Sequence, residues 1–106
     1  MLTFSKARKL AETYVEVMCD GKAELVREAV IAKPYGWVFF YQSSAHLRET
    51  SNISDAFAGN APFIVDRDSG EIRVLGTALP AETYLENFES NLPPARLYRK
   101  PELPSW

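Results

Sequence analysis

The fold is decided by one apolar stretch near the middle of the chain, Trp37-Val38-Phe39-Phe40-Tyr41. Its residues are all aromatic or β-branched, the types that favour strands. Because side chains alternate between the two faces of a strand, a run without polar residues buries both faces. We therefore expect residues 37–41 to form the central strand of a sheet, covered on at least one side by helices.

The segment before this strand has the pattern of an amphipathic helix. Its apolar residues recur three and four positions apart on one stripe: Ala7, Leu10, Ala11, Tyr14, Val15 and Met18. Thr3 or Ser5 can cap the N-terminus, and Gly21 stands where a left-handed cap would end the helix. The spacing predicts a helix over residues 4–19.

Three more segments have strand character. Aliphatic and β-branched residues predict a strand over 25–32. Residues 63–65 and the alternating segment 71–75 predict a hairpin around a tight turn at 66–70, since aspartate favours the start of a turn and glycine tolerates positive φ.

A second helix is predicted from Pro80, which suits a first helical position, to about residue 91. Its buried stripe comprises Tyr84, Leu85 and Phe88. The order is helix, four strands, helix. We expect an α+β fold, with an antiparallel sheet of about four strands and an N-terminal and a C-terminal helix packed on one face.

Residues 92–106 differ in composition from the rest of the chain. They contain four prolines, Pro93, Pro94, Pro101 and Pro104, which disfavour regular structure. The sequence therefore predicts one α+β domain over residues 1–91 and an extended, proline-rich tail over 92–106.

The composition is that of one ordinary globular domain. The 106 residues are 46% hydrophobic and 25% charged, with a net charge of −2. A mildly acidic chain disfavours nucleic-acid binding. The single cysteine cannot form an internal disulfide, and we find neither a signal-peptide pattern nor an apolar run long enough for a membrane span. We expect a cytoplasmic protein.

The residues offer little for catalysis. Cys19 and His46 are the only nucleophile–base pair of their kind, and Cys19 falls at the C-terminal end of a helix, where the helix dipole opposes a thiolate. Asp66 and Asp68 suit a hairpin turn better than a paired-carboxylate or calcium site. Residues 59–62 lack the lysine and serine or threonine of a phosphate loop. We expect no enzyme activity, no catalytic residues, no metal site and no cofactor.

Two further features have more than one interpretation. Glu82, Glu86 and Glu89 fall on one helical face, which either engages a basic partner or is simply solvated. Trp37 and Phe39 either line a pocket or fill the core, and aromatic residues of a central strand usually fill the core.

Three segments carry a family resemblance: YGWVF at 35–39, GNAPFIVDRDSG at 59–70 and LPAETYL at 79–85. Together they resemble the YrhB-like immunity-protein domain, immunity protein 35, of bacterial polymorphic toxin systems. The resemblance covers about residues 4–90 and leaves the proline-rich tail outside.

The resemblance implies an antitoxin of interbacterial competition, encoded beside its toxin, which often has a papain-like or related amidase fold. The shared residues have structural interpretations in turns and core, and we expect them to specify the scaffold: Gly36, Trp37, Gly59, Asn60, Pro62, Asp66 and Gly70.

We expect the partner to be bound elsewhere, on variable surface. The loop over 43–61 is long for a compact domain, and long loops are often functional. Its candidate contacts are His46, Arg48, Glu49, Asn52 and Phe57. The glutamates at 82, 86 and 89 are the second candidate surface.

Two alternatives stay open. One is a chaperone-like holdase of the YrhB type, with Leu97, Tyr98 and Trp106 adding to an exposed apolar patch. The other is a small hydrolase that uses Cys19 and His46. The sequence does not identify the toxin or its reaction, and it leaves a homodimer possible.

Overall fold

The central strand is β3 (Gly36–Phe39), which is buried at every position. It ends two residues before the predicted end at Tyr41, because Tyr41 starts β4 (Tyr41–Ser43), which pairs with a strand of a second sheet. The computed structural model describes residues 1–44 and 60–106. Within them, β3 pairs antiparallel with β2 (Ile31–Lys33) on one side and with β5 (Phe63–Asp66) on the other. Trp37 lies opposite Val65. The most apolar strand of the sequence therefore has a neighbouring strand on each side.

Three shorter strands complete two antiparallel sheets. β6 (Ile72–Val74) pairs with β5 in the predicted hairpin and gives the larger sheet the order β2-β3-β5-β6. β1 (Ala23–Leu25) and β4 (Tyr41–Ser43) form a second sheet of two strands. The predicted α+β class with an antiparallel sheet of four strands is confirmed.

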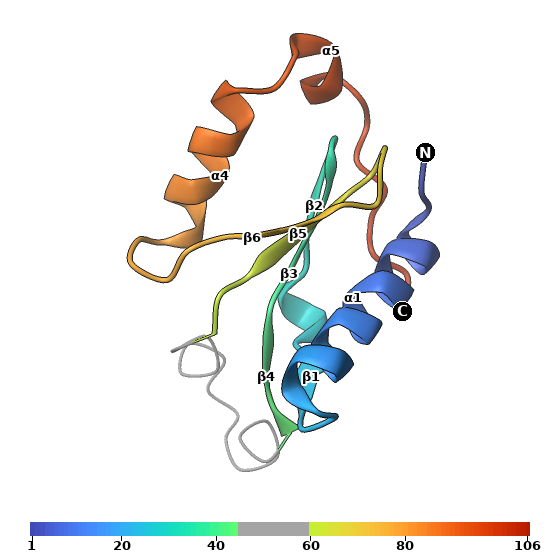
Figure 1. The fold of residues 1–106 in the computed structure, drawn as a ribbon. Coiled ribbons are helices and arrows are strands. Elements are labelled where there is room, and N and C mark those ends of the chain that lie inside the picture. The colour runs from blue at the N-terminus through green and yellow to red at the C-terminus, as the bar shows by residue number, and fades with distance from the viewer. Residues whose placement is uncertain (45–59) are drawn as a thin grey trace.

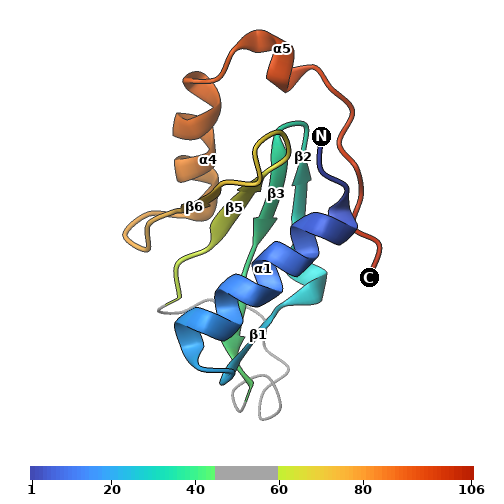
Figure 2. The same cartoon turned by 45° about the vertical axis from the view of Figure 1, so that its right-hand side comes forward.

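The main helices lie on opposite faces of the larger sheet, as Figure 1 and Figure 2 show. α1 (Phe4–Cys19) packs on the side of Trp37 and Phe39, and α4 (Ala81–Ser90) packs on the side of Val38 and Phe40. The prediction that both helices share one face is wrong. Because β3 is apolar on both sides, each side needs its own cover.

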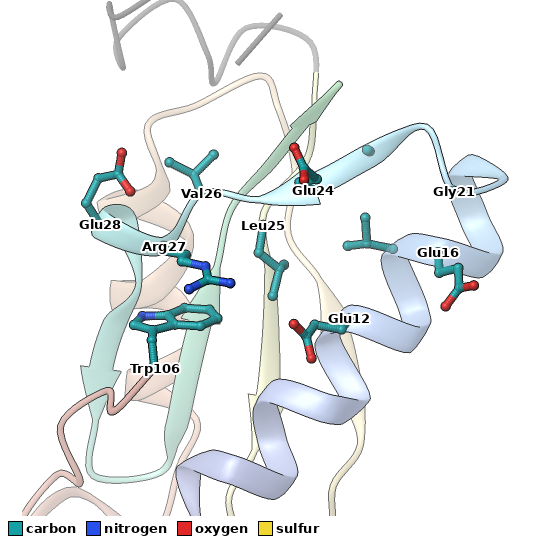
Figure 3. Close-up of a pocket in the computed structure, with 11 residues that line it drawn as sticks. Glu12, Glu16, Gly21, Glu24, Leu25, Val26, Arg27, Glu28 and Trp106 are labelled. Carbon is teal, nitrogen blue, oxygen red and sulfur yellow. The ribbon is translucent and has the colours of Figure 1, made fainter. Parts of the chain in front are cut away.

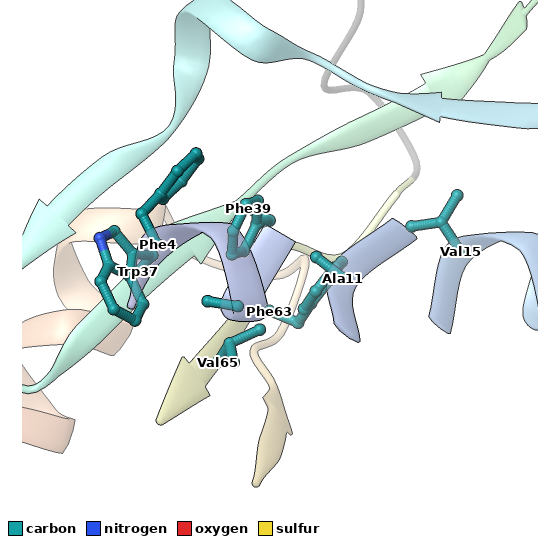
Figure 4. Packing of buried hydrophobic residues seen from close by; sticks show 8 residues of the cluster. Phe4, Ala11, Val15, Trp37, Phe39, Phe63 and Val65 are labelled. Atoms are coloured by element: carbon teal, nitrogen blue, oxygen red, sulfur yellow. The ribbon is translucent and has the colours of Figure 1, made fainter. Parts of the chain in front are cut away.

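The core under α1 is largely aromatic, as Figure 4 shows. The ring of Phe4 meets that of Trp37 edge-on, with centroids 6.0 Å apart, and Phe39 stacks on Phe63 at 5.8 Å. All four side chains are fully buried. Burial of such rings gives several kcal/mol each by area, about 25 cal/mol per Å2, so this layer anchors the fold.

Both predicted ends of α1 are close to the observed ones. The side-chain oxygen of Thr3 accepts a hydrogen bond from the main-chain N–H of Lys6, which is the expected N-cap. At the other end Asp20 takes the left-handed conformation, with φ of 51°, and Gly21 follows at 72°. The helix therefore ends at Cys19 as predicted, and the left-handed conformation begins at Asp20, one residue before Gly21.

The predicted strand over 25–32 is wrong, because it is two strands with a helical turn between them. Leu25 pairs with Tyr41, whereas Ile31 pairs with Val38. From Leu25 to Ile31 the chain advances six residues, whereas their partners Tyr41 and Val38 are only three residues apart. The three extra residues form the 3-10 helix η1 (Arg27–Ala29). The segment changes sheets at this turn.

The proline-rich segment is not simply extended. Residues 94–97 form a short helix, α5 (Pro94–Leu97), with proline at its first position, where the missing N–H costs nothing. The rest returns to α1: the main-chain N–H of Phe4 donates to Glu102 Oε2 at 2.6 Å, and Trp37 Nε1 donates to the carbonyl of Glu102 at 2.7 Å. The segment over 92–106 is bound to the scaffold along its length.

Candidate partner-binding surface

A groove of about 580 Å3 runs between α1 and the β1–η1 segment, and Figure 3 shows it from close by. Leu25 of β1 lies at its apolar base, Trp106 lies at one end, and the buried Val15 of α1 also lines it. Its remaining lining includes Glu12, Glu16, Gly21, Ala23, Glu24, Val26, Arg27 and Glu28. Two consecutive segments, α1 and β1–η1, and the distant residue Trp106 therefore build one concave surface.

The rim of this groove, which we call the acidic groove, is dominated by carboxylates. Glu12 and Glu16 lie one turn apart on α1, and Glu24 and Glu28 lie on the opposite bank. All four are exposed, and Arg27 is the one base among the described residues that line it. Clustered carboxylates on a concave surface concentrate negative potential and favour a positively charged ligand.

Trp106 closes one end of the acidic groove. Its ring lies edge-on to Phe4 at 5.2 Å, and two guanidinium groups lie over it, Arg8 at 4.8 Å and Arg27 at 5.2 Å. Such cation–π contacts are attractive and hold the ring in place. The half-buried indole thus joins residues 92–106 to the groove.

The acidic groove lies next to the start of the segment that the sequence singles out. β1 pairs with β4, and β4 ends at Ser43, one residue before the described part of the chain is interrupted. Gln42 is 8% exposed, and its Oε1 accepts hydrogen bonds from Asn60 Nδ2 at 2.8 Å and from the N–H of Ser43 at 2.9 Å. These bonds tie β4 to the residues at which the described chain resumes.

The β5–β6 turn carries a network of ion pairs with residues 92–106. Arg96 Nη2 lies 2.8 Å from Asp66 Oδ2, and Arg99 makes a two-pronged contact with Asp68 at 2.7 and 2.8 Å. The hydrogen bond from Arg99 lowers the pKa of Asp68 to about 2. Burial opposes ionisation of Asp66, but hydrogen bonds from Arg96 and from the turn lower its pKa. The carboxylates of Asp66 and Asp68 are thus held in ion pairs within the fold.

All five loop residues predicted to bind the partner lie outside the described residues, as does Gly59 of the motif: His46, Arg48, Glu49, Asn52 and Phe57. Their roles stay predictions. Of the residues that flank this part of the chain, Asn60 is half-buried and Pro62 is buried, and the carbonyl of Pro62 accepts from the N–H of Leu75 at 2.8 Å.

The three glutamates of α4 are not equivalent. Glu82 and Glu86 are exposed, but Glu89 lies 3.2 Å from Lys33 Nζ and accepts a hydrogen bond from the Tyr35 hydroxyl at 2.8 Å. Burial of Tyr35, together with that hydrogen bond, raises the pKa of its hydroxyl. Glu89 therefore links α4 to the β2–β3 turn, and the stripe offers a partner only two free carboxylates among these three.

The motif residues occupy tight places in the scaffold. A Cβ at Gly36 would collide with the carbonyl oxygen of Val65 on the neighbouring strand. Asp66 Oδ1 accepts from the N–H groups of Asp68 and Ser69 at 2.8 and 3.1 Å, and Gly70 completes the turn with φ of 76°. The buried Trp37 fills the core between α1 and the sheet.

Only Cys19 of the candidate Cys19–His46 pair lies among the described residues. Cys19 is half-buried and packs against the aromatic core, while His46 lies outside the described part of the chain. Across residues 1–44 and 60–106, no three histidine, cysteine or acidic side chains gather in a way that could hold a metal ion. No helix in those ranges is long and apolar enough to cross a membrane.

Sequence reasoning missed the acidic groove. The spacing of Glu12 and Glu16, four residues apart on a predicted helix, was a usable signal for one bank. The second bank depends on the turn at η1, and the end wall depends on the return of residues 92–106 to α1. Neither is visible in local periodicity.

The fold and the groove define an α+β protein with one helix on each face of its sheet and an acidic concave surface along the first helix. The sequence model of the family described as immunity protein 35 matches residues 5–90, so the chain belongs to that family. The predicted resemblance is confirmed.

The chain is also similar to the uncharacterized protein YrhB of Escherichia coli (strain K12), with 52% identity over 54 residues. The aligned stretch is 51% of this chain and 56% of YrhB, so the chain spans little more than half the length of this curated relative. No solved structure matches the chain.

Proposed function

We propose that this chain is an antitoxin that binds one cognate bacterial toxin and inhibits it without catalysing a reaction itself. Membership of the immunity protein 35 family carries this proposal. The packing of Cys19 against the core supports the absence of enzyme activity, because a nucleophile needs access and a base. The proposed site of action is the cytoplasm, and the proposed mode is occlusion of the toxin's active cleft.

The acidic groove is the surface that we assign to the toxin. Exposed carboxylates around an apolar base suit a basic segment with an apolar side chain, which the base of the groove would desolvate. Glu12 already pairs with Arg8, whose Nε lies 3.3 Å from Glu12 Oε2, so Glu16, Glu24 and Glu28 are the carboxylates that we assign to the ligand. The loop over 43–61 begins one strand away and, in this proposal, extends the same contact. A toxin with a papain-like or related amidase fold and a positively charged cleft rim meets these requirements.

Co-expression tests the proposal. The product of the neighbouring gene, expressed alone in a sensitive host, should arrest growth, and this chain should restore growth and co-purify with it in a one-to-one complex. A second, unrelated toxin serves as the control and should stay toxic. The proposal fails if the neighbouring product is harmless, or if it is toxic and this chain neither binds it nor relieves its toxicity.

The packing of two residues that the sequence assigned to an apolar patch supports the inhibitor over the holdase. A holdase needs a broad apolar patch. Of the three residues that the sequence assigned to such a patch, Leu97 and Trp106 pack against the two cores and only Tyr98 is exposed, at 85%. In an aggregation assay with unrelated heat-denatured clients, we expect no protection.

A further inference from the structure

We propose that the free edge of β6 and the groove beside it bind an extended segment of a partner protein, which adds a strand to the sheet. This surface is separate from the acidic groove and does not depend on the identity of the toxin. Its ligand is defined by two chemical requirements, an acidic side chain and an apolar side chain two positions before it.

The main-chain groups of β6 alternate in direction. The N–H of Leu75 donates to Pro62 at 2.8 Å and the carbonyl of Glu71 accepts from Asp66 at 2.9 Å, so odd-numbered residues face β5. The N–H and C=O groups of Ile72 and Val74 therefore point away from β5. In the described part of the chain no strand lies beyond β6, and Val74 is 51% exposed.

A groove of about 510 Å3 adjoins this edge on the α4 side. Its strand wall consists of Arg73, Val74 and Leu75, followed by Gly76. Its helix wall uses Tyr84, Asn87, Phe88, Asn91 and Leu92, which recur along one flank of α4 and just beyond it. Figure 1 shows β6 leading from the hairpin to the start of α4. A strand edge with a groove between it and a helix suits peptide binding by strand addition.

The charge of this groove selects the occupant. Arg73 is the one charged residue among the described residues that line it, and its guanidinium lies over the ring of Phe88 at 5.3 Å. In an antiparallel pair, opposite residues share a face. A ligand residue opposite Arg73 therefore points into the groove, and an acidic side chain at that position can pair with the guanidinium of Arg73. The residue opposite Leu75 points the same way and meets the apolar wall.

The register fixes the order of the ligand. All neighbours in this sheet are antiparallel, and an antiparallel ligand places the residue opposite Leu75 two positions before the residue opposite Arg73. The recognised pattern is thus apolar, any residue, acidic. The two residues that flank the acid exchange hydrogen bonds with Ile72 and Val74.

A synthetic peptide tests the inference with the intact chain. The probe is acetyl-Ser-Thr-Leu-Thr-Glu-Thr-Ser-amide, added to about 2 mM because so few hydrogen bonds give weak binding. In NMR spectra of the nitrogen-15-labelled chain, the amide signals of Ile72 and Val74 should shift and their hydrogen exchange should slow. Replacing the glutamate by lysine should weaken binding about threefold or more.

Two controls separate strand addition from other contacts. N-methylation of the two threonines beside the glutamate removes the main-chain donors and should weaken binding about tenfold. Val74→Pro removes the outward N–H of β6 and should have the same effect, since proline is tolerated at a sheet edge. If Val74→Pro does not fold, the test is the affinity of the N-methylated peptide compared with that of its parent peptide, both measured on the unaltered chain.

Three outcomes overturn the inference. The first is that no shift appears at Ile72 and Val74. The second is that the N-methylated peptide binds as well as its parent. The third is that both amides shift with protein concentration in the absence of peptide, which assigns the edge to a second copy of this chain.

Discussion

At the scale of single residues, contacts between backbones set the strongest constraints. Gly36 is the clearest case, because a side chain there would meet the backbone of β5 and not a flexible group. Gly21 is constrained differently: nothing lies within 4 Å of a Cβ at that position, but φ is +72°. The two glycines of the α1–β3 region thus have different physical reasons for being glycine.

Alanine at these two positions should separate the two reasons. Gly36→Ala must push β3 from β5, and we expect a loss of about 3 kcal/mol in the free energy of unfolding. Gly21→Ala should cost only about 1 kcal/mol, from the left-handed backbone. Urea denaturation measures both. Equal losses would show that the close approach at Gly36 is not the limiting contact.

Trp106 is the residue whose environment the sequence predicted least well. Trp106→Ala removes a half-buried ring from Phe4 and from two guanidinium groups, and should cost about 2 kcal/mol of unfolding free energy. Tyr98→Ala, at a position 85% exposed, is the matched control and should change stability by less than about 0.5 kcal/mol. Trp37 remains as the fluorescent probe of unfolding in both variants. A neutral Trp106→Ala would contradict the packed arrangement of residues 92–106.

At the scale of elements, the sequence predicted best where burial is local and worst where partners are distant. The stripe from Ala7 to Met18 predicts α1 well, because its period is visible within one helix. Residues 25–32 look like one strand, since the three surplus residues that form η1 appear only when both partners are known. Residues 92–106 look extended, because their anchors on Phe4, Asp66 and Asp68 are far away in sequence.

The ion pairs of the β5–β6 turn should make a small, pH-dependent contribution to stability. The folded pKa of Asp68, about 2, is below the ordinary value near 4. A lowered pKa stabilises the fold above the ordinary value, and this stabilisation is lost as the pH falls from about 4 to about 2. Because the pairs are partly exposed, Asp68→Asn should cost no more than about 1 kcal/mol at pH 7.

The test for Asp68 is the difference in unfolding free energy between the unaltered chain and Asp68→Asn. That difference should fall steeply as the pH drops from about 4 towards 2, and it should shrink in high salt. Glu71→Gln removes an acid of the same hairpin outside this network and is the matched control, with an expected cost below about 0.5 kcal/mol at pH 7. A difference that stays constant down to pH 2 would mean that Asp68 acts through something other than its charge.

At the scale of the whole molecule, the candidate site is made by topology. The apolar stretch over 37–41 indicated two buried faces, and the order of helices and strands along the chain indicated the α+β class. The apolar stretch also implied cover on both sides, which the prediction of two helices on one face overlooked. The acidic groove needs α1, the turn at η1 and the return of Trp106 in one place, so no single segment could reveal it.

The most direct test of the account compares two charge reversals of equal size in binding to the cognate toxin. Glu24→Lys with Glu28→Lys alters the acidic groove, whereas Glu82→Lys with Glu86→Lys alters the exposed face of α4. At low salt the first pair should weaken toxin binding about tenfold or more, and the second should change it less than about twofold. Both variants should unfold like the parent chain. The opposite ranking, with the α4 pair losing affinity and the groove pair binding normally, would contradict the assignment of the toxin to the acidic groove.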